Sequence, residues 1–228
     1  MNPDAARASS LAAAARALVG QASFDDTLEA VARTARESLP GFDHVSVALL
    51  SRSGRIETKA VTDSLARDLD SLQYSVDEGP CLSAIRDVTM VAVPDLREEQ
   101  RWPRYLPGAI SAGLRAQMSV PLAVDEEHPI GGLNLYSTSR GGSPTDADEM
   151  VASFATHASI ALHQARQVAN LRDALDSRKV IGQAIGIIME RYQLSEDRAF
   201  AYLVRASSHA NIKLRQIAQD LVNENNTR

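Results

Sequence analysis

The last quarter of the chain holds cationic and hydrogen-bonding side chains of the kinds that bind an anionic polymer. Lysine and arginine hold phosphates, while amides and hydroxyls form hydrogen bonds with bases and sugars. The cations are Lys179, Arg205, Lys213 and Arg215, and the polar side chains are Gln183, Ser207 and Asn211. Each residue taken alone is more commonly a solvated helix residue or a helix cap, and Asn211 suits the N-cap of a last helix.

Two glycines lie among these residues, inside a stretch with helical periodicity. Gly182 and Gly186 are four residues apart, hence on one helix face, and Ala184 lies close by. Glycine inside a helix costs about 1 kcal/mol relative to alanine, so the pair needs an explanation. Small residues let a second backbone approach closely. On the sequence alone, that backbone is a neighbouring helix about as readily as a nucleic acid.

The remaining candidates for chemistry do not assemble into an enzyme. The single cysteine, Cys81, follows Pro80 at an expected helix start, where a thiolate and redox sensing are conceivable, but a lone cysteine is more commonly a small buried hydrophobe. The acid pair Asp77-Glu78 has no accompanying nucleophile or phosphate loop. His157 and His163 are six residues apart and share no helix face. We therefore predict no catalysis, no metal site and no cofactor.

The first two thirds of the chain have the pattern of an α+β domain. Helices are expected at 8–20, 24–39, 64–72, 80–86 and, irregularly, 101–111. Strands are expected at 44–50, 55–61, 90–93, 116–124 and 130–138, the first two joined as a hairpin by the turn at 52–54 and the last two by the loop 125–129. This order favours a largely antiparallel sheet covered by helices.

A long helix is expected to follow, beginning at 143–145. No proline occurs after Pro144, and the first candidate weak point is Gly182. The apolar stripe steps by alternating four and three residues, which is typical of a coiled coil. Its members are Phe154, Ala158, Ala161, Ala165, Val168, Leu171 and Leu175. We expect the first half of the helix to cover the sheet and the second half to pair with a second copy.

Three helical units close the chain. They are the end of the long helix to about Arg191, a helix capped by Ser195, and a helix beginning near Asn211. Met189 and Phe200 are expected in their shared core. About 60 residues are few for independent stability, which again favours a dimer.

Composition places the chain among globular proteins of the cytoplasm. Hydrophobic residues make up 44% and charged residues 23%, which suits a packed core. No apolar run approaches the roughly 18 residues of a membrane span, and no secretory signal pattern is evident. The net charge is -5, but residues 171–228 hold nine Lys/Arg against seven Asp/Glu. A mildly basic end on an acidic body suits a nucleic-acid-binding segment, although solvated helices commonly produce the same asymmetry.

The last segment resembles the ANTAR family of transcription antiterminators over residues 171 to about 222. The resemblance rests on residues 178–191 (RKVIGQAIGIIMER), 194–200 (LSEDRAF) and 205–207, and on Asn211, Lys213, Leu214, Arg215 and Ala218. One departure is Ile185, where the family often has lysine. If that lysine holds phosphate in relatives, this chain lacks one such contact.

The first part resembles a GAF domain of the kind joined to ANTAR modules in actinobacteria, over about residues 20–165. The resemblance rests on residues 77–81 (DEGPC), 101–103 (RWP), 120–122 (VPL), 131–136 (GGLNLY) and 154–155 (FA).

The two resemblances imply a GAF-like sensory domain at 1–165, a coiled-coil helix at 144–180 and an ANTAR-like RNA-binding domain at 171–228. They imply a homodimer that holds paired RNA hairpins in nascent transcripts, with an unidentified small-molecule ligand of the GAF domain left open. The implied RNA-binding residues are Lys179, Gly182, Gln183, Ala184, Gly186, Arg205, Ser207, Asn211, Lys213 and Arg215. The alternatives are a DNA-binding helix-turn-helix regulator and a ligand or redox sensor that acts through protein partners.

Overall fold

The computed structural model describes residues 12–51, 53–124, 129–139 and 147–226. The chain divides into two compact units, unit 1 (residues 1–166) and unit 2 (residues 167–228). Three expectations lie partly or wholly outside the described residues. They are the start of the long helix at 143–145, the first residues of the helix at 8–20, and most of the loop at 125–129.

Unit 1 is built on a five-stranded sheet in which every pair of neighbours is antiparallel. The strand order is β2-β1-β5-β4-β3. The strands are β1 (His44–Leu50), β2 (Ile56–Val61), β3 (Val91–Val93), β4 (Ala116–Ala123) and β5 (Pro129–Ser137). The α+β fold and the five predicted strands are confirmed. Gly131 is required where β5 pairs with β1, because a Cβ there would collide with the carbonyl of Ala48.

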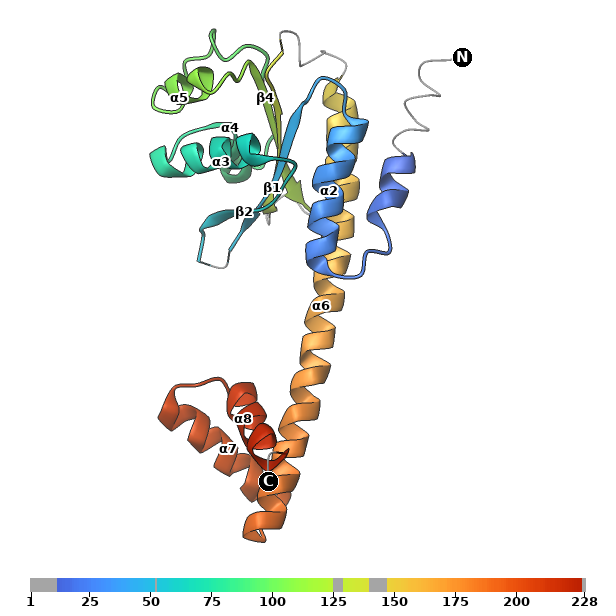
Figure 1. Cartoon of the computed structure of the whole chain (residues 1–228), viewed down its shortest axis with the longest axis vertical. Coiled ribbons are helices and arrows are strands. Elements are labelled where there is room, and N and C mark those ends of the chain that lie inside the picture. Colours follow the sequence, from blue (N-terminus) through green and yellow to red (C-terminus); the bar gives the residue numbers. More distant parts are fainter. Residues whose placement is uncertain (1–11, 52, 125–128, 140–146, 227–228) are drawn as a thin grey trace. The chain divides into compact units, whose positions relative to one another are not determined.

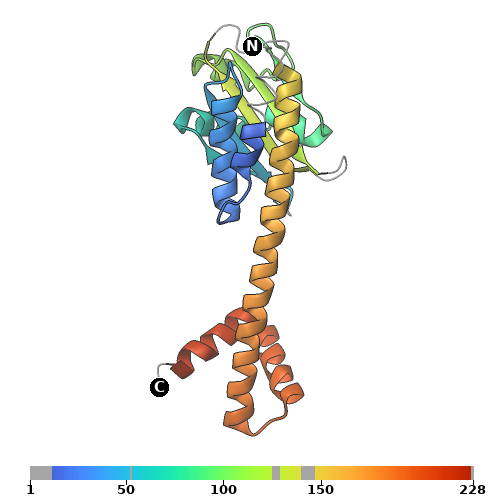
Figure 2. The same ribbon diagram turned by 90° about the vertical axis from the view of Figure 1, so that its right-hand side faces the viewer.

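Helices cover both faces of this sheet (Figures 1 and 2). One face carries α2 (Phe24–Ser38) and the first half of α6 (Ala147–Tyr192), and the other carries α3 (Ser64–Val76), α4 (Pro80–Asp87) and α5 (Leu106–Ser111). Ser23 caps α2, accepting a hydrogen bond from the Asp26 backbone N–H at 3.1 Å. The helix predicted from residue 101 begins only at Leu106, because residues 103–105 form a turn before it.

Helix α6 belongs to both units and changes its environment along its length. Phe154 and Ala158 are buried in the core shared with α2 and the sheet, as predicted for the first half. Beyond Gln167 the helix is largely exposed, including Leu171 and Leu175. The helix continues through Gly182 without a break, so the expected weak point does not interrupt it. Pairing of the second half with another copy stays a prediction.

Unit 2 is a three-helix arrangement, as predicted. It comprises the end of α6, α7 (Glu196–Ala210) and α8 (Leu214–Asn226), and Figure 2 shows α7 turning back beside the end of α6. Its core contains Ala184, Ile188, Ala199, Leu203, Ala218 and Val222. No helix in the described part of the chain has the length and apolar character that crossing a membrane requires.

Candidate nucleic-acid interface

Three of the predicted binding residues lie on one exposed face of α6. Lys179, Gln183 and Gly186 are spaced i, i+4 and i+7, which aligns them on a helix, and all three are exposed. Ala184 is a correction to the expected surface. Its side chain is fully buried in the core of unit 2, on the side of the helix away from Lys179. The small size of Ala184 therefore serves packing inside the unit.

The two glycines on α6 are not explained by packing within the described chain. A Cβ built on Gly182 or Gly186 meets no atom within 4 Å in either case. Gly186 instead forms part of a shallow hollow of about 440 Å³ between α6 and α8. The hollow is lined by Gln183, Gly186, Ile187, Glu190, Val222 and Asn225. The space above both glycines is open to a partner from outside the chain.

Ser207 and Asn211 have structural roles at the end of α7. The Ser207 hydroxyl donates a hydrogen bond to the carbonyl of Ile212 at 2.5 Å. Asn211 is the C-cap of α7 with a left-handed backbone (φ 53°), a conformation that asparagine tolerates well. It is therefore not the N-cap of the last helix, because α8 begins at Leu214. The Ser207 hydroxyl and the Asn211 backbone therefore help to end α7, and of the two residues only Asn211 is exposed.

The cations of α7 and α8 are solvent-exposed. Arg205 lies on α7, Lys213 precedes α8, and Arg215 lies in the first turn of α8. The Arg215 guanidinium lies 3.6 Å from the carboxylate of Asp173 on α6, with both side chains largely exposed. Such surface pairs contribute little stability and leave the guanidinium available to phosphate.

A further face of α7, not predicted from the sequence, combines cations with aromatic rings. Arg198, Tyr202, Arg205 and His209 are spaced i, i+4, i+7 and i+11, so they share one exposed face. The ring of Tyr192, at the end of α6, lies 5.8 Å from that of Tyr202, and the two residues are 51% and 44% exposed. The spacing around Arg205 was the signal available in the sequence. We name these five residues the α7 aromatic face.

Of the two residues predicted for the core of unit 2, Met189 is placed correctly and Phe200 is not. Met189 packs against the core, whereas Phe200 is 45% exposed. The acidic residues of α7 are Glu196 and Asp197, and both precede Arg198 on other sides of the helix from the α7 aromatic face. The exposed surface of α7 is thus apolar and cationic along most of its length.

Cys81 and the acid pair Asp77-Glu78 in unit 1 are buried or ion-paired. Cys81 is fully buried, and burial, together with the nearby Asp70, raises the pKa of its thiol far above the usual range. The Asp77 carboxylate pairs with Arg86. That of Glu78 accepts a hydrogen bond from Arg104 Nε at 2.7 Å, and hydrogen bonds from Arg104 lower the pKa of Glu78. The residues that the structure describes contain no cluster of three potential metal ligands.

Comparison with family models gives two matches that together span most of the chain. Residues 21–163 match the model of the GAF domain, and residues 169–222 match the model of the ANTAR domain. No curated protein matches the chain.

Solved structures resemble the fold at low sequence identity. A GAF domain from an Acinetobacter phosphoenolpyruvate-protein phosphotransferase is 14% identical, with a TM-score of 0.56 over 72% of this chain and 97% of that one. A free methionine-R-sulfoxide reductase from Neisseria meningitidis is 17% identical, with a TM-score of 0.56 over 74% and 95%. The photosensory core module of a Stigmatella aurantiaca phytochrome is 14% identical, with a TM-score of 0.62 over 88% and 44%. At these identities the likeness concerns the fold alone.

Proposed function

From the premise that the chain belongs to the family of proteins that join a GAF domain to an ANTAR domain, we propose that it is a transcription antiterminator that binds RNA hairpins as a homodimer. Both domains are regulatory, and the proposed protein has no catalytic activity of its own. Acting on nascent transcripts, it works in the cytoplasm. A signal received by the GAF domain, including a small-molecule ligand, alters RNA binding through α6.

The observation that carries the proposal is the exposed face of α6 in the ANTAR-matched segment. Lys179 supplies a cation, Gln183 supplies an amide, and Gly186 provides an opening at which another backbone can approach. Because nothing in the described chain fills the space above Gly182 and Gly186, an outside partner is the economical explanation of both glycines. Arg205, Lys213 and Arg215 add exposed cations for phosphate.

The α7 aromatic face suits the unpaired part of an RNA hairpin. Hairpin loops present bases that are free to stack on aromatic side chains, and flanking arginines hold the adjacent phosphates. Tyr192 and Tyr202 supply neighbouring rings, with Arg198 and Arg205 on either side of Tyr202 along the helix. We therefore propose that loop bases stack on this tyrosine pair.

The test is binding of the purified full chain to an RNA with two tandem hairpins, at several salt concentrations. A one-hairpin RNA and duplex DNA of the same sequence are the comparisons. We expect the two-hairpin RNA to bind most tightly, with an affinity that falls as salt rises because phosphate contacts release counterions. Lys179→Ala should weaken binding and reduce the salt dependence by about one phosphate contact.

Tyr202→Leu separates base stacking from simple packing. Leucine retains apolar contact with Tyr192 but has no ring, and loss of one base–aromatic stack costs about 1–3 kcal/mol of binding. Tyr202→Phe should bind nearly as well as the parent. Arg97→Ala, which removes an exposed cation from unit 1, is the matched control for Lys179→Ala. Equal or better binding to duplex DNA would favour a helix-turn-helix regulator, and a Tyr202→Leu protein with unchanged affinity would exclude the stacking role.

A further inference from the structure

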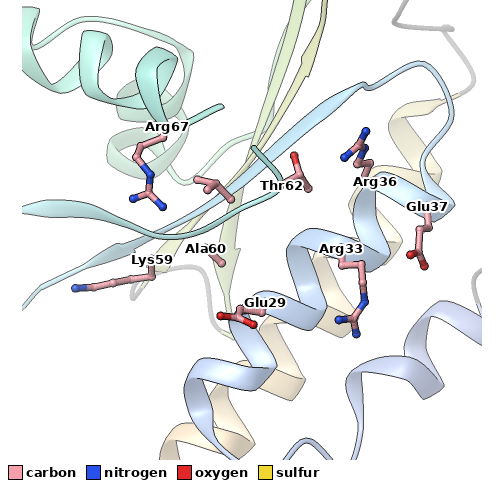
Figure 3. Close-up of a pocket in the computed structure, with 9 residues that line it drawn as sticks. Glu29, Arg33, Arg36, Glu37, Lys59, Ala60, Thr62 and Arg67 are labelled. Carbon is pink, nitrogen blue, oxygen red and sulfur yellow. The ribbon is translucent and has the colours of Figure 1, made fainter. Parts of the chain in front are cut away.

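A groove in unit 1 runs along β2, one of the two edge strands of the sheet. It has a volume of about 700 Å³, within the range of small-molecule sites. Residues from α2, β2 and α3 line it, namely Glu29, Arg33, Arg36, Glu37, Lys59, Ala60, Val61, Thr62 and Arg67. We name it the β2 groove. Figure 3 shows Arg67 on the α3 side of β2 and Arg33 and Arg36 on the α2 side, so that the strand runs between the two sets of guanidinium groups.

The β2 groove is locally cationic in an acidic chain. Its four cations and two carboxylates give a formal charge of +2, against -5 for the whole sequence. Lys59 is paired with Glu57 at 2.7 Å. Within the described part of the chain, no carboxylate forms an ion pair with Arg33, Arg36 or Arg67. Three arginines therefore reach the groove with their guanidinium groups uncommitted.

Only the fold brings these arginines together. Arg36 lies on a helix of one layer and Arg67 on a helix of the opposite layer, and the edge of the sheet separates them. A guanidinium presents a planar fork of donors that matches the oxygens of phosphate and carboxylate groups. An anion with a single charged group would satisfy one side of β2. An anion with several charged groups would satisfy both.

We propose that the β2 groove binds a small anion with two or more phosphate or carboxylate groups, held by Arg36 on one side of β2 and Arg67 on the other. Arg33 reinforces the α2 side. Glu29 and Glu37 limit the affinity, because their charges oppose the ligand. The site is separate from the RNA-binding surface proposed for unit 2, because every residue that lines it belongs to unit 1.

The experiment is calorimetric titration of the full chain with tripolyphosphate and, separately, with citrate, at low and moderate sodium chloride. We expect saturable binding that weakens as salt rises. Arg36→Gln and Arg67→Gln should each weaken binding about tenfold, the effect of losing one charge-assisted contact. Glu29→Gln should strengthen binding severalfold, because it removes a repelling charge. The controls are Arg97→Gln, an exposed arginine next to the opposite edge strand β3, and Arg67→Lys, which keeps the charge but loses the fork.

Thermal melts of each variant establish that the protein remains folded, and the two-hairpin RNA is titrated in parallel. Loss of anion binding in Arg36→Gln and Arg67→Gln with unchanged RNA affinity supports the β2 groove. Three results would overturn it. They are no saturable binding of either anion, equal weakening by Arg97→Gln, and binding that is lost in Lys179→Ala but kept in both groove variants. The last result would place the anion on the RNA-binding surface.

Discussion

At the scale of single residues, the most unusual group is the carboxyl of Asp70, which is fully buried in unit 1. Three side chains donate hydrogen bonds to it, Thr58 at 2.6 Å, Asn134 at 3.0 Å, and Tyr136. These bonds favour the ionised form, whereas burial opposes it. Burial is the larger effect and raises the pKa of Asp70. The folded protein therefore holds a proton at this site more tightly than the unfolded chain does.

The raised pKa of Asp70 in the folded protein predicts how the free energy of unfolding depends on pH. A raised folded pKa contributes stability that is fully present below the ordinary carboxyl pKa and is lost as pH rises through the folded value. Asp70→Asn, which resembles the protonated form, should therefore melt at a higher temperature than the parent at pH 7. The difference should shrink towards pH 4. Thermal melts of both proteins between pH 4 and 8 provide the measurement. A variant less stable than the parent at pH 7 would mean that the three hydrogen bonds outweigh burial.

Cys81 yields a second prediction at this scale, about reactivity. The thiol is fully buried, and burial raises its pKa, so neither access nor thiolate is available in the folded state. Iodoacetamide at pH 7.5 should leave the folded protein unmodified and label one thiol after denaturation, as mass spectrometry would measure. Rapid labelling of the native protein would revive the redox-sensing hypothesis that the sequence left open.

At the scale of elements, the glycines of α6 cost helix stability and leave open space at the proposed RNA-binding surface. Gly186 has open space above it, so a methyl group there meets nothing in the described chain and removes the conformational penalty of glycine. Gly186→Ala should therefore stabilise the free protein by up to about 1 kcal/mol while weakening RNA binding. Chemical denaturation and the RNA titration measure the two effects.

The inverse substitution Ala174→Gly separates the effect of helix propensity on stability from the effect of direct contact with RNA. Ala174 is exposed on the same helix, outside the proposed surface, and should lose about 1 kcal/mol of stability while keeping RNA affinity. If Gly186→Ala makes the free protein more stable but weakens its RNA binding, then binding requires the glycine. Unchanged RNA affinity for Gly186→Ala would exclude close approach of RNA there.

The elements were largely predictable from the sequence because their signals are local. The turn at 52–54 between two apolar stretches indicated the hairpin of β1 and β2, and helical periodicity indicated α2. Local periodicity does not say which neighbours cover a residue, however. Phe200 therefore looked like core but is exposed, and Ala184 looked like surface but is buried. The groove between Arg36 and Arg67 depends on the strand order of the sheet, which no local pattern specifies.

The same limit applies to helix ends in unit 2. Asn211 follows α7 and precedes α8, and its residue type suits either role. Only its left-handed backbone assigns it to the end of α7. Similarly, the helix propensity of glycine made Gly182 a candidate break, but the surrounding helix-forming residues extend α6 to Tyr192. The surrounding structure therefore determines both the cap role of Asn211 and the continuity of α6 at Gly182.

At the scale of the whole molecule, the second half of α6 carries an apolar stripe without a partner in the described chain. Val168 and Leu175 are seven residues apart, and Leu171 lies between them on the same side of the helix. Leu171 and Leu175 are 65% and 68% exposed. Large side chains at this spacing form the seam of a two-stranded coiled coil. Leu171 and Leu175 lie within the matched ANTAR segment, so the seam reaches the proposed RNA-binding module.

We therefore predict that the chain dimerises through this seam and that Leu175→Glu abolishes the dimer. Charges introduced at a seam position repel each other across the twofold axis and remove apolar contact. Asn170→Glu, exposed on the opposite side of α6, should leave the dimer intact. Sedimentation equilibrium of the three proteins over a range of concentrations measures the association. A Leu175→Glu protein that still dimerises would place the interface elsewhere.

Dimerisation also predicts how affinity depends on the number of hairpins. Two linked modules bind a two-hairpin RNA with an effective local concentration in the millimolar range, so the second contact adds avidity without new chemistry. The Leu175→Glu monomer should lose this gain and bind one-hairpin and two-hairpin RNAs nearly equally, whereas its affinity for one hairpin should match that of the parent. Asn170→Glu should retain the preference for two hairpins. A monomer that still prefers two hairpins would show that one module contacts both, and the dimer would then have no part in recognition.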